Sequence, residues 1–353
     1  MLERRSFLKS LPLSAATLAA AGRAAGDAAS SPPADPAAGS GPASDRFGEL
    51  LPMRTLGGTG QRVTALALGG SHFLKEVPSQ QSQAFADDVI AEGIRFIDTA
   101  EAYGQGRSET LIGKTFVPKY RDAIYLMSKT GARDAAEAEK DLADSLRRLN
   151  VDRIDCYQMH AIQNEDDVDR RLDQGVLDVL LKAQSDGKIG HLGFTGHNTP
   201  AAHLRMLARL DGMGLQLQTC QIPINVVDQH YASFIDRVLP ELERRDYGVL
   251  AMKTLAFGQL LGRRTSWANH SPEQPKRVIP DTVSIEQALQ FVWSHDAVST
   301  LVSGITGVEE LRQNAAALRT FKPMDQDQRV ALVEQTRYAG GENMEFYKAP
   351  GVP

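Results

Sequence analysis

Four side chains that can hold or exchange a proton stand at or just after the ends of short apolar runs. Asp98, Lys129 and His160 each close such a run, and Tyr103 follows Asp98 by five residues. A tyrosine hydroxyl has an ordinary pKa of about 10, and a nearby ammonium lowers it by stabilising the phenolate. A carboxylate keeps that ammonium charged, while a neutral imidazole can donate to a carbonyl oxygen. Together the four would donate a proton to an oxygen that gains negative charge.

The elements that must position these residues repeat along the chain. Eight apolar runs are each followed by turn residues, and their starts lie roughly thirty residues apart, as in repeated βα units. The last interval is longer because of an insertion at Gly258–Asp281. The runs are Val63–Gly69, Ile94–Thr99, Ala123–Lys129, Ile154–His160, Ile189–Thr195, Leu215–Ile222, Gly248–Thr254 and Ser299–Gly304.

Amphipathic helices are predicted between the runs. In Ala135–Leu149, the apolar residues recur at helical spacing on one face. Similar patterns occur in Gln174–Asp186, Ser233–Arg245 and Val308–Leu318. Apolar strands alternating with helices predict a parallel sheet, and eight units predict an α/β fold of the closed (β/α)8 TIM barrel type. In such a barrel, catalytic groups lie at the carboxyl ends of the strands, which places all four side chains in one mouth.

Segments outside the repeated units complete the predicted domain. The glycine-rich stretch Met53–Val63 predicts a β-hairpin that caps the bottom of the barrel. The folded barrel is predicted over residues 46–325, and residues 326–353 are predicted to form an irregular C-terminal tail.

The N-terminus resembles an export signal. Arg4 and Arg5 are followed by Ser-Phe-Leu-Lys, then by a weakly apolar alanine-rich stretch and small residues that a signal peptidase could cleave. We interpret residues 1–29 as a twin-arginine signal peptide and residues 30–45 as a disordered linker of small residues. Glu3 departs from the usual pattern. The twin-arginine translocase is therefore an expected partner, and the expected location is the periplasm or another exported compartment.

Composition excludes several classes of function. Apolar residues make up 42% of the chain and the formal net charge is -5, so no general attraction to nucleic acid or anionic lipid is expected. No run reaches the ~20 apolar residues of a membrane span, so none is expected in the mature protein. Cys156 and Cys220 lie in apolar runs, which favours buried inert thiols, and no metal site is expected.

Several motifs, in order, resemble the aldo-keto reductase family. They include Phe96–Gly104, Leu126–Thr130, Ile154–His160 and Gly187–Gly193, and the opening hairpin is similar as well. The resemblance covers about residues 51–318. It implies a nicotinamide-dependent oxidoreductase that passes hydride between the cofactor and a small-molecule carbonyl or alcohol substrate.

The resemblance also assigns roles to residues. Tyr103 would be the general acid–base, Lys129 and Asp98 would tune it, and His160 would orient the carbonyl. Asn225 would lie close to the nicotinamide amide, which the family holds around Thr195 and Gln221. The full set of implied cofactor-binding residues is Gly70, Ser71, Asp98, Thr195, Gln221, Lys253, Leu255, Gly258, Ser303, Gly304, Gln313 and Asn314.

The chain departs from the family pattern at three places. Thr195-Gly196 stands where Ser-Asn is usual, so one amide contact is missing, and either His197 or Asn198 replaces it or nothing does. Met252 stands where an aromatic ring often stacks on the nicotinamide. The segment 303–310 lacks the Lys or Arg that binds the phosphate of NADP, and Glu310 would repel it. NADP is the expected cofactor, with NAD as the alternative.

Other readings remain open at this point. The departures leave room for a cofactor-binding regulatory or sensor barrel with little turnover. A metal-dependent barrel hydrolase would need several ligands at strand ends, and only Asp98 and His160 qualify. Substrate selection is expected from loops at the mouth. The residues concerned are Ser71–Phe73, Trp267 with His270 in the insertion, and Phe346 with Tyr347 in the tail. The alternative for the tail is that it only covers the face of a helix.

Overall fold

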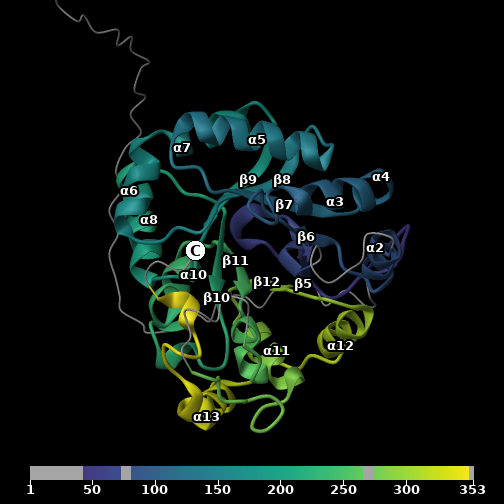
Figure 1. Ribbon diagram of the computed structural model, residues 1–353, viewed down its shortest axis with the longest axis vertical. Coiled ribbons are helices and arrows are strands. Elements are labelled where there is room, and N and C mark those ends of the chain that lie inside the picture. The colour runs from purple at the N-terminus through teal and green to yellow at the C-terminus, as the bar shows by residue number, and fades with distance from the viewer. Residues whose placement is uncertain (1–42, 73–80, 265–272, 350–353) are drawn as a thin grey trace, which may run out of the picture. The chain divides into compact units, whose positions relative to one another are not determined.

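The computed structural model describes residues 43–72, 81–264 and 273–349. Parallel strands form a closed barrel in the order β10-β11-β12-β5-β6-β7-β8-β9, so the predicted fold is confirmed. Figure 1 shows these strands at the centre with helices around them. The strands are β5 (Leu66–Gly69), β6 (Phe96–Asp98), β7 (Tyr125–Thr130), β8 (Ile154–Met159), β9 (Ile189–Thr195), β10 (Thr219–Pro223), β11 (Gly248–Met252) and β12 (Val298–Ser303).

The strands of the barrel are buried on both faces. Every residue of β5, β6, β7 and β10 is buried, as expected for parallel strands between a filled interior and a layer of helices. Both cysteines are buried free thiols, as the sequence predicts. Burial raises the pKa of the Cys156 thiol to about 12, so it is unreactive at neutral pH.

Helices follow the strands and cover the barrel. The helix predicted at Ala135–Leu149 has these bounds (α5), because Asp134 caps its first turn and Asn150 ends it in a left-handed conformation. The other helices that cover the barrel are α2 (Ser82–Ala91), α3 (Arg107–Thr115), α4 (Val117–Tyr120), α6 (Glu165–Asp173), α7 (Val176–Ser185), α8 (Pro200–Gly212), α9 (Phe234–Arg237), α10 (Leu239–Arg244), α11 (Ile285–Trp293) and α12 (Val308–Arg319).

Two antiparallel hairpins precede the barrel. β3 (Met53–Thr55) pairs with β4 (Arg62–Thr64), and the turn between them bonds to the segment that leads into β11, through the Gly58 amide and the Asp246 carbonyl at 2.8 Å. The hairpin therefore lies at the amino ends of the strands, as predicted. The second hairpin pairs β1 (Ser44–Asp45) with β2 (Gly48–Glu49), so among the described residues regular structure is present two residues before the predicted boundary at Arg46.

Two predictions about helices are wrong. The segment Ser233–Arg245 forms two short helices, α9 and α10, because Pro240 lies at the start of α10 and cannot continue the hydrogen bonds of α9. The chain after Met324 is not irregular: α13 (Gln326–Thr336) begins with a capping box between Asp325 and Gln328.

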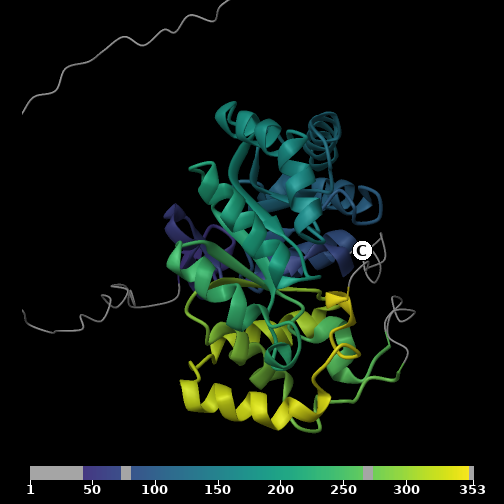
Figure 2. The ribbon, with the colours of Figure 1, turned by 90° about the vertical axis from the view of Figure 1, so that its left-hand side faces the viewer.

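After α13 the chain returns to the carboxyl ends of the strands. Figure 2 shows this yellow segment turning back from α13 toward the barrel. It passes through η5 (Arg337–Ala339) to η6 (Phe346–Lys348), whose three residues are buried. Residues of this C-terminal tail, including Phe346 and Tyr347, therefore belong to the hydrophobic core of the domain. Among the described residues, no helix combines the length and apolar character needed to cross a membrane.

Candidate active site

Lys129 joins three groups at the carboxyl ends of β6 and β7. Its ammonium forms a close ion pair with Asp98, donates to the Thr99 carbonyl at 2.8 Å, and donates to the Tyr103 hydroxyl at 3.4 Å. Lys129 and Asp98 are almost fully buried, whereas Tyr103 is half-buried. The structure therefore brings the predicted carboxylate, ammonium and hydroxyl into one connected cluster.

The loop that carries Tyr103 is tied to both neighbouring strands. Glu101 accepts a hydrogen bond from the Gly131 amide after β7, at 3.0 Å. Ser108 donates to the Gly70 carbonyl after β5 at 3.0 Å, and it accepts from Thr99 at 2.8 Å. Because these bonds link β5, β6 and β7, the hydroxyl of Tyr103 is held beside Lys129 by a fixed loop.

His160 lies beside Tyr103 at the end of β8. The two rings are 5.5 Å apart and meet edge to face at 81°. The buried Arg171 of α6, paired with Asp167, donates to the His160 carbonyl at 2.7 Å. Ala161 then turns with a φ of 51°. Arg171 thus fixes the main chain that carries the imidazole, a contact that the sequence analysis missed.

Burial controls the protonation of this cluster. Burial, the Lys129 ammonium and the neighbouring His197 lower the pKa of His160 well below its ordinary value, so the imidazole is neutral at neutral pH. Burial acts against the charge on Lys129, but the Asp98 carboxylate and Tyr103 outweigh it and raise its pKa.

The pKa of Tyr103 differs from the sequence-based prediction. Lys129 does lower the pKa of Tyr103, as predicted, but burial has the larger effect and raises this pKa above its ordinary value. The hydroxyl is therefore a protonated donor at neutral pH.

The residues predicted to hold the nicotinamide lie on β9 and β10. Gln221 hydrogen-bonds Asp98, and Thr195 donates to the Gln221 carbonyl at 3.0 Å. A Cβ on Gly196 would lie 2.5 Å from the Ile162 carbonyl, which explains why this chain has glycine where the family often has asparagine. The side chains of His197 and Asn198, the two candidates to replace that amide, bond to the carbonyls of Tyr347 and Ala349 in the tail.

The loop after β11 has an unusual main chain. Lys253, Ala256, Phe257 and Gly258 all have positive φ angles, of 58°, 46°, 59° and 88°. Leu255 packs on the core between them. Positive φ angles at these four residues wind the main chain of this segment, which is the one predicted to run along the pyrophosphate.

Buried polar atoms of the same loop fit a ligand. The hydroxyl of Thr254 and both amide atoms of Gln259 find no hydrogen-bond partner among the residues that the structure describes. Buried polar groups without hydrogen-bond partners are rare in proteins. A polar ligand such as the cofactor could form hydrogen bonds with these three atoms.

The predicted adenosine end lies after β12. Ser303 accepts a hydrogen bond from the buried Asn314 at 3.0 Å, and Gly304 lies against the His72 ring and leaves no room for a Cβ. Gln313, the other residue predicted here, has an exposed side chain on α12, whereas the side chain of Asn314 is buried against Ser303. Ser71 and Gly70, after β5, border the same end of the barrel.

Sequence comparison decides the family. The profile of the Aldo/keto reductase family matches residues 65–287, which includes the strand ends from β5 to β11. The chain belongs to the aldo/keto reductase family. Its fold and the order of its motifs therefore agree with the family that the sequence resembles.

Relatives cover nearly the whole folded part of this aldo/keto reductase. The uncharacterized oxidoreductase YqkF of Bacillus subtilis (strain 168) is 24% identical over 325 residues, which cover 84% of this chain and 98% of YqkF. L-galactose dehydrogenase of Arabidopsis thaliana is 27% identical over 311 residues, with 79% and 91% covered. The aldo-keto reductase AKR11C1 from Bacillus halodurans, in its holo form, superposes with a TM-score of 0.65 at 22% identity, covering 84% of this chain and 99% of its own.

The tail of this aldo/keto reductase contains a buried charged cluster that the sequence analysis missed. Lys348 donates to Asp228 at 2.7 Å, to Glu345 at 2.8 Å and to the Tyr231 carbonyl at 2.7 Å. The side chains of Lys348, Asp228 and Glu345 are 0% exposed. Lysine and glutamate are rarely buried unless paired, so the cluster anchors the tail. No local pattern could have paired Asp228 with a lysine so distant in the chain.

The aromatic residues of the tail border the mouth. Phe346 packs against Phe257 of the loop after β11 with ring centroids 6.1 Å apart, and Tyr347 meets the His197 ring edge to face at 5.9 Å. The tail therefore contacts two loops of the mouth. Phe73, Trp267 and His270, which were predicted to act with it, lie outside the described residues.

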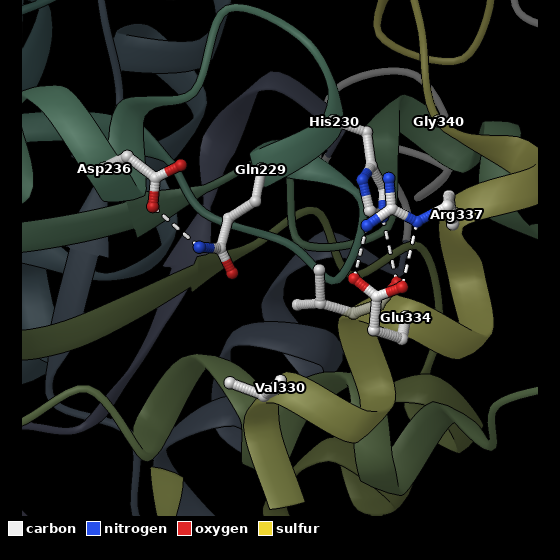
Figure 3. A pocket seen from close by; sticks show the side chains of 8 residues that line it. Gln229, His230, Asp236, Val330, Glu334, Arg337 and Gly340 are labelled. Carbon is white, nitrogen blue, oxygen red and sulfur yellow. Dashed lines mark hydrogen bonds and ion pairs between the residues drawn. The ribbon is translucent and has the colours of Figure 1, made fainter. Parts of the chain in front are cut away.

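A groove of about 490 Å³ lies elsewhere on this aldo/keto reductase. Figure 3 shows its lining side chains, which come from the region of η2 (Asp228–His230) and α9 and from α13. Gln229 donates to Asp236, and Arg337 pairs with Glu334. None of the predicted site residues lines this groove.

Proposed function

We propose that this aldo/keto reductase transfers hydride between a nicotinamide dinucleotide and a small carbonyl or alcohol substrate, with Tyr103 as the proton donor and acceptor. The observation that carries this proposal is the single ammonium of Lys129, which bonds to both Asp98 and the Tyr103 hydroxyl. When bound, the cofactor supplies or accepts the hydride.

The protein's own residues supply the rest of the reaction. In reduction, Tyr103 gives its proton to the carbonyl oxygen, and the Lys129 ammonium stabilises the phenolate that remains. Asp98 keeps Lys129 charged and in place. The neutral His160, beside the Tyr103 ring, donates a hydrogen bond to the same oxygen and orients the substrate. Thr195, Gln221, Thr254 and Gln259 are the side chains that would hold the dinucleotide.

Cofactor titration tests the proposal. NADPH and NADH are titrated against the intrinsic fluorescence of the purified folded domain, and reduction of a generic aldehyde is followed in parallel. We expect saturable binding of at least one nucleotide together with turnover. Tight binding without turnover would favour a regulatory or sensor barrel, and binding of neither nucleotide would refute the oxidoreductase assignment.

The start of α12 supports the NAD alternative over the expected NADP. Glu310 accepts two hydrogen bonds from Thr306, at 2.9 Å from the amide and 2.6 Å from the hydroxyl. Arg312 is exposed and lies 3.6 Å from Glu92, so it is directed toward an acidic partner. A phosphate on the adenosine ribose would therefore meet the charge of Glu310.

Glu310→Gln is expected to tighten NADPH binding by about fivefold, because removing one nearby charge relieves roughly 1 kcal/mol of repulsion in a hydrated site. NADH binding should change less, since it lacks that phosphate. Nucleotide dissociation constants measured by fluorescence check this. Glu309→Gln removes the same charge from an exposed neighbour and is the matched control. If Glu310→Gln tightens NADPH and NADH binding equally, Glu310 has no specific role at the phosphate. The same holds if Glu309→Gln tightens NADPH binding as much as Glu310→Gln does.

The rate of reduction is expected to stay level between about pH 6 and pH 9. Burial raises the pKa of Tyr103, so the hydroxyl stays protonated below that pKa and the rate falls only as pH rises through it. His160 is already neutral at pH 6 because its pKa is lowered. The check is kcat for a neutral aldehyde at saturating cofactor. A loss of rate below a midpoint near pH 6.5 would instead indicate that an imidazole titrates in this range.

Export is a separate proposal. The Arg4-Arg5 pair and the small residues after it support passage through the twin-arginine translocase, which carries folded proteins. These residues lie outside the described part of the chain. Cell fractionation tests the proposal: the mature protein should appear in the periplasm, and Arg4→Lys with Arg5→Lys should retain it in the cytosol. If the wild type and the double lysine variant divide between periplasm and cytosol in the same way, the proposal is contradicted.

A further inference from the structure

The imidazole of His160 depends on its main chain for its direction. Its ring meets the Tyr103 ring edge to face with centroids 5.5 Å apart, and among the residues that the structure describes no hydrogen bond reaches either ring nitrogen. A histidine that acts through one ring nitrogen is usually fixed by a hydrogen bond at the other. Without such a bond from the described residues, the backbone at residues 160 and 161 must set the direction of the ring.

That backbone adopts a conformation that residues with a side chain seldom take. Ala161 has a φ of 51°, in the left-handed region, and such strain persists only where the surroundings enforce it. The amides of His160 and Ile162 bond to carbonyls at the ends of β7 and β9, at 2.8 and 2.9 Å. Arg171 of α6 also holds this turn, since its guanidinium donates to the His160 carbonyl at 2.7 Å and to the Ala161 carbonyl at 3.5 Å.

Arg171 is a cation that the fold keeps buried. Its side chain is 1% exposed, and its guanidinium lies 3.0 Å from the Asp167 carboxylate one turn earlier on α6. Asp167 also pairs with Arg133 at 3.1 Å, so two arginines share its charge. A buried ion pair often adds little stability over apolar residues of similar volume, so stability alone does not explain an arginine here. Its bonds to two successive carbonyls behind the imidazole indicate a role at the mouth.

The positive charge of Arg171 also reaches the ring of His160. Burial has the largest effect in lowering the pKa of His160, and the charges of four neighbouring groups, Arg171 among them, lower it further. The groups that face the ring are Tyr103 from the loop after β6, Lys129 with its partner Asp98, His197 from the loop after β9, Arg171 from α6 and Lys253 from the loop after β11. Because Arg171 belongs to a covering helix, it disfavours the imidazolium without occupying the mouth.

We propose that Arg171 is a positioning residue for the reaction, whose guanidinium fixes the turn after His160 and thereby directs the imidazole at the substrate oxygen. This inference rests on the proposed function, in which the neutral imidazole donates to that oxygen. The described contacts of Arg171 are with main-chain carbonyls and with Asp167, so it acts through His160 and not on the substrate.

A double-mutant cycle between Arg171 and His160 tests the inference. Alone, Arg171→Met should lower kcat/KM for a neutral aldehyde about 100-fold, because a displacement of about 1 Å at a reacting group can cost that much. In a His160→Gln background the same change should cost no more than about twofold, since the group that Arg171 positions is gone. Nucleotide Kd should keep its wild-type value. If the two losses multiply, Arg171 acts independently of His160 and the inference is overturned.

Two further variants separate positioning from stability. Arg171→Lys keeps the charge but loses the planar fork, so it should retain part of the activity that Arg171→Met loses. It takes the place of Arg171→Met in the cycle if the methionine variant does not fold. Arg205→Met is the matched control, because Arg205 pairs with Asp169 on the same helix at 2.8 Å and is 40% exposed. Equal losses in Arg205→Met and Arg171→Met would show a general effect of α6 and overturn the inference.

A titration of the His160 ring by nuclear magnetic resonance needs no turnover. The ring signal, assigned by its loss in His160→Gln, should titrate at higher pH in Arg171→Met, because a cation that disfavours the imidazolium is removed. Arg171→Lys and Arg205→Met should titrate as the wild type does. An unchanged titration in Arg171→Met would overturn the inference. If the shift is seen in a protein that binds no nucleotide, only the proposed function fails, and the influence of Arg171 on His160 stands.

Discussion

Tyr103→Phe is expected to lower kcat for aldehyde reduction by about 10²–10⁴-fold, the range for losing a positioned general acid. The substitution removes only the hydroxyl, which lies 3.4 Å from the Lys129 ammonium. The phenyl ring can keep its edge contact with His160, so the shape of the mouth is retained. The loss should therefore fall on proton transfer and not on folding. Steady-state kinetics at saturating cofactor measure it.

Two comparisons make the Tyr103 result specific. Nucleotide Kd should change little in Tyr103→Phe, because Tyr103 is not among the residues predicted to hold the dinucleotide. Tyr338→Phe is the matched control, since Tyr338 is 46% exposed and its hydroxyl bonds only to Thr282 among the described residues. If Tyr103→Phe keeps most of the wild-type kcat, the proton comes from another group and the assignment of Tyr103 is wrong.

The grouping of the candidate site residues could be predicted because it depends on strand ends. Once the apolar runs are assigned to parallel strands, Asp98, Lys129 and His160 must meet at one end of the barrel. The pattern is local, and β9 (Ile189–Thr195) agrees with its prediction at both ends. The protonation of Tyr103 could not be derived in the same way. The sequence shows which charges are near, but the amount of burial decides which of them dominates.

The C-terminal part could not be predicted for a different reason. Apolar residues of α13 lack a helical stripe, so only the capping box at Asp325 and Gln328 marks this helix. Glu345 and Lys348 look like exposed residues, because charged side chains are usually solvated. Their partner Asp228 follows β10, and no spacing rule connects it to the tail. Tertiary contacts alone decide that these charges are buried.

Lys348→Met is expected to destabilise the protein by about 3–5 kcal/mol, because it leaves two buried carboxylates without their ammonium. Asp228 and Glu345 share Lys348 and are fully buried, so water cannot replace the lost charge. For a domain of this size the loss corresponds to a fall in Tm of roughly 6–15 °C. Thermal and urea denaturation measure it, and Lys182→Met is the matched control because its pair with Asp186 is exposed.

The same cluster offers a test of how the destabilisation arises. Glu345→Gln added to Lys348→Met removes one of the two buried carboxylates that Lys348→Met leaves unpaired. The glutamine side chain can still bond to Asn225 and Tyr347. The double variant should therefore be more stable than Lys348→Met alone, a non-additive result expected for groups in one network. If each change destabilises independently, the cluster is held by packing and not by charge. If Tm is unchanged but the tail becomes sensitive to protease, the anchor holds only the tail, and the barrel folds without it.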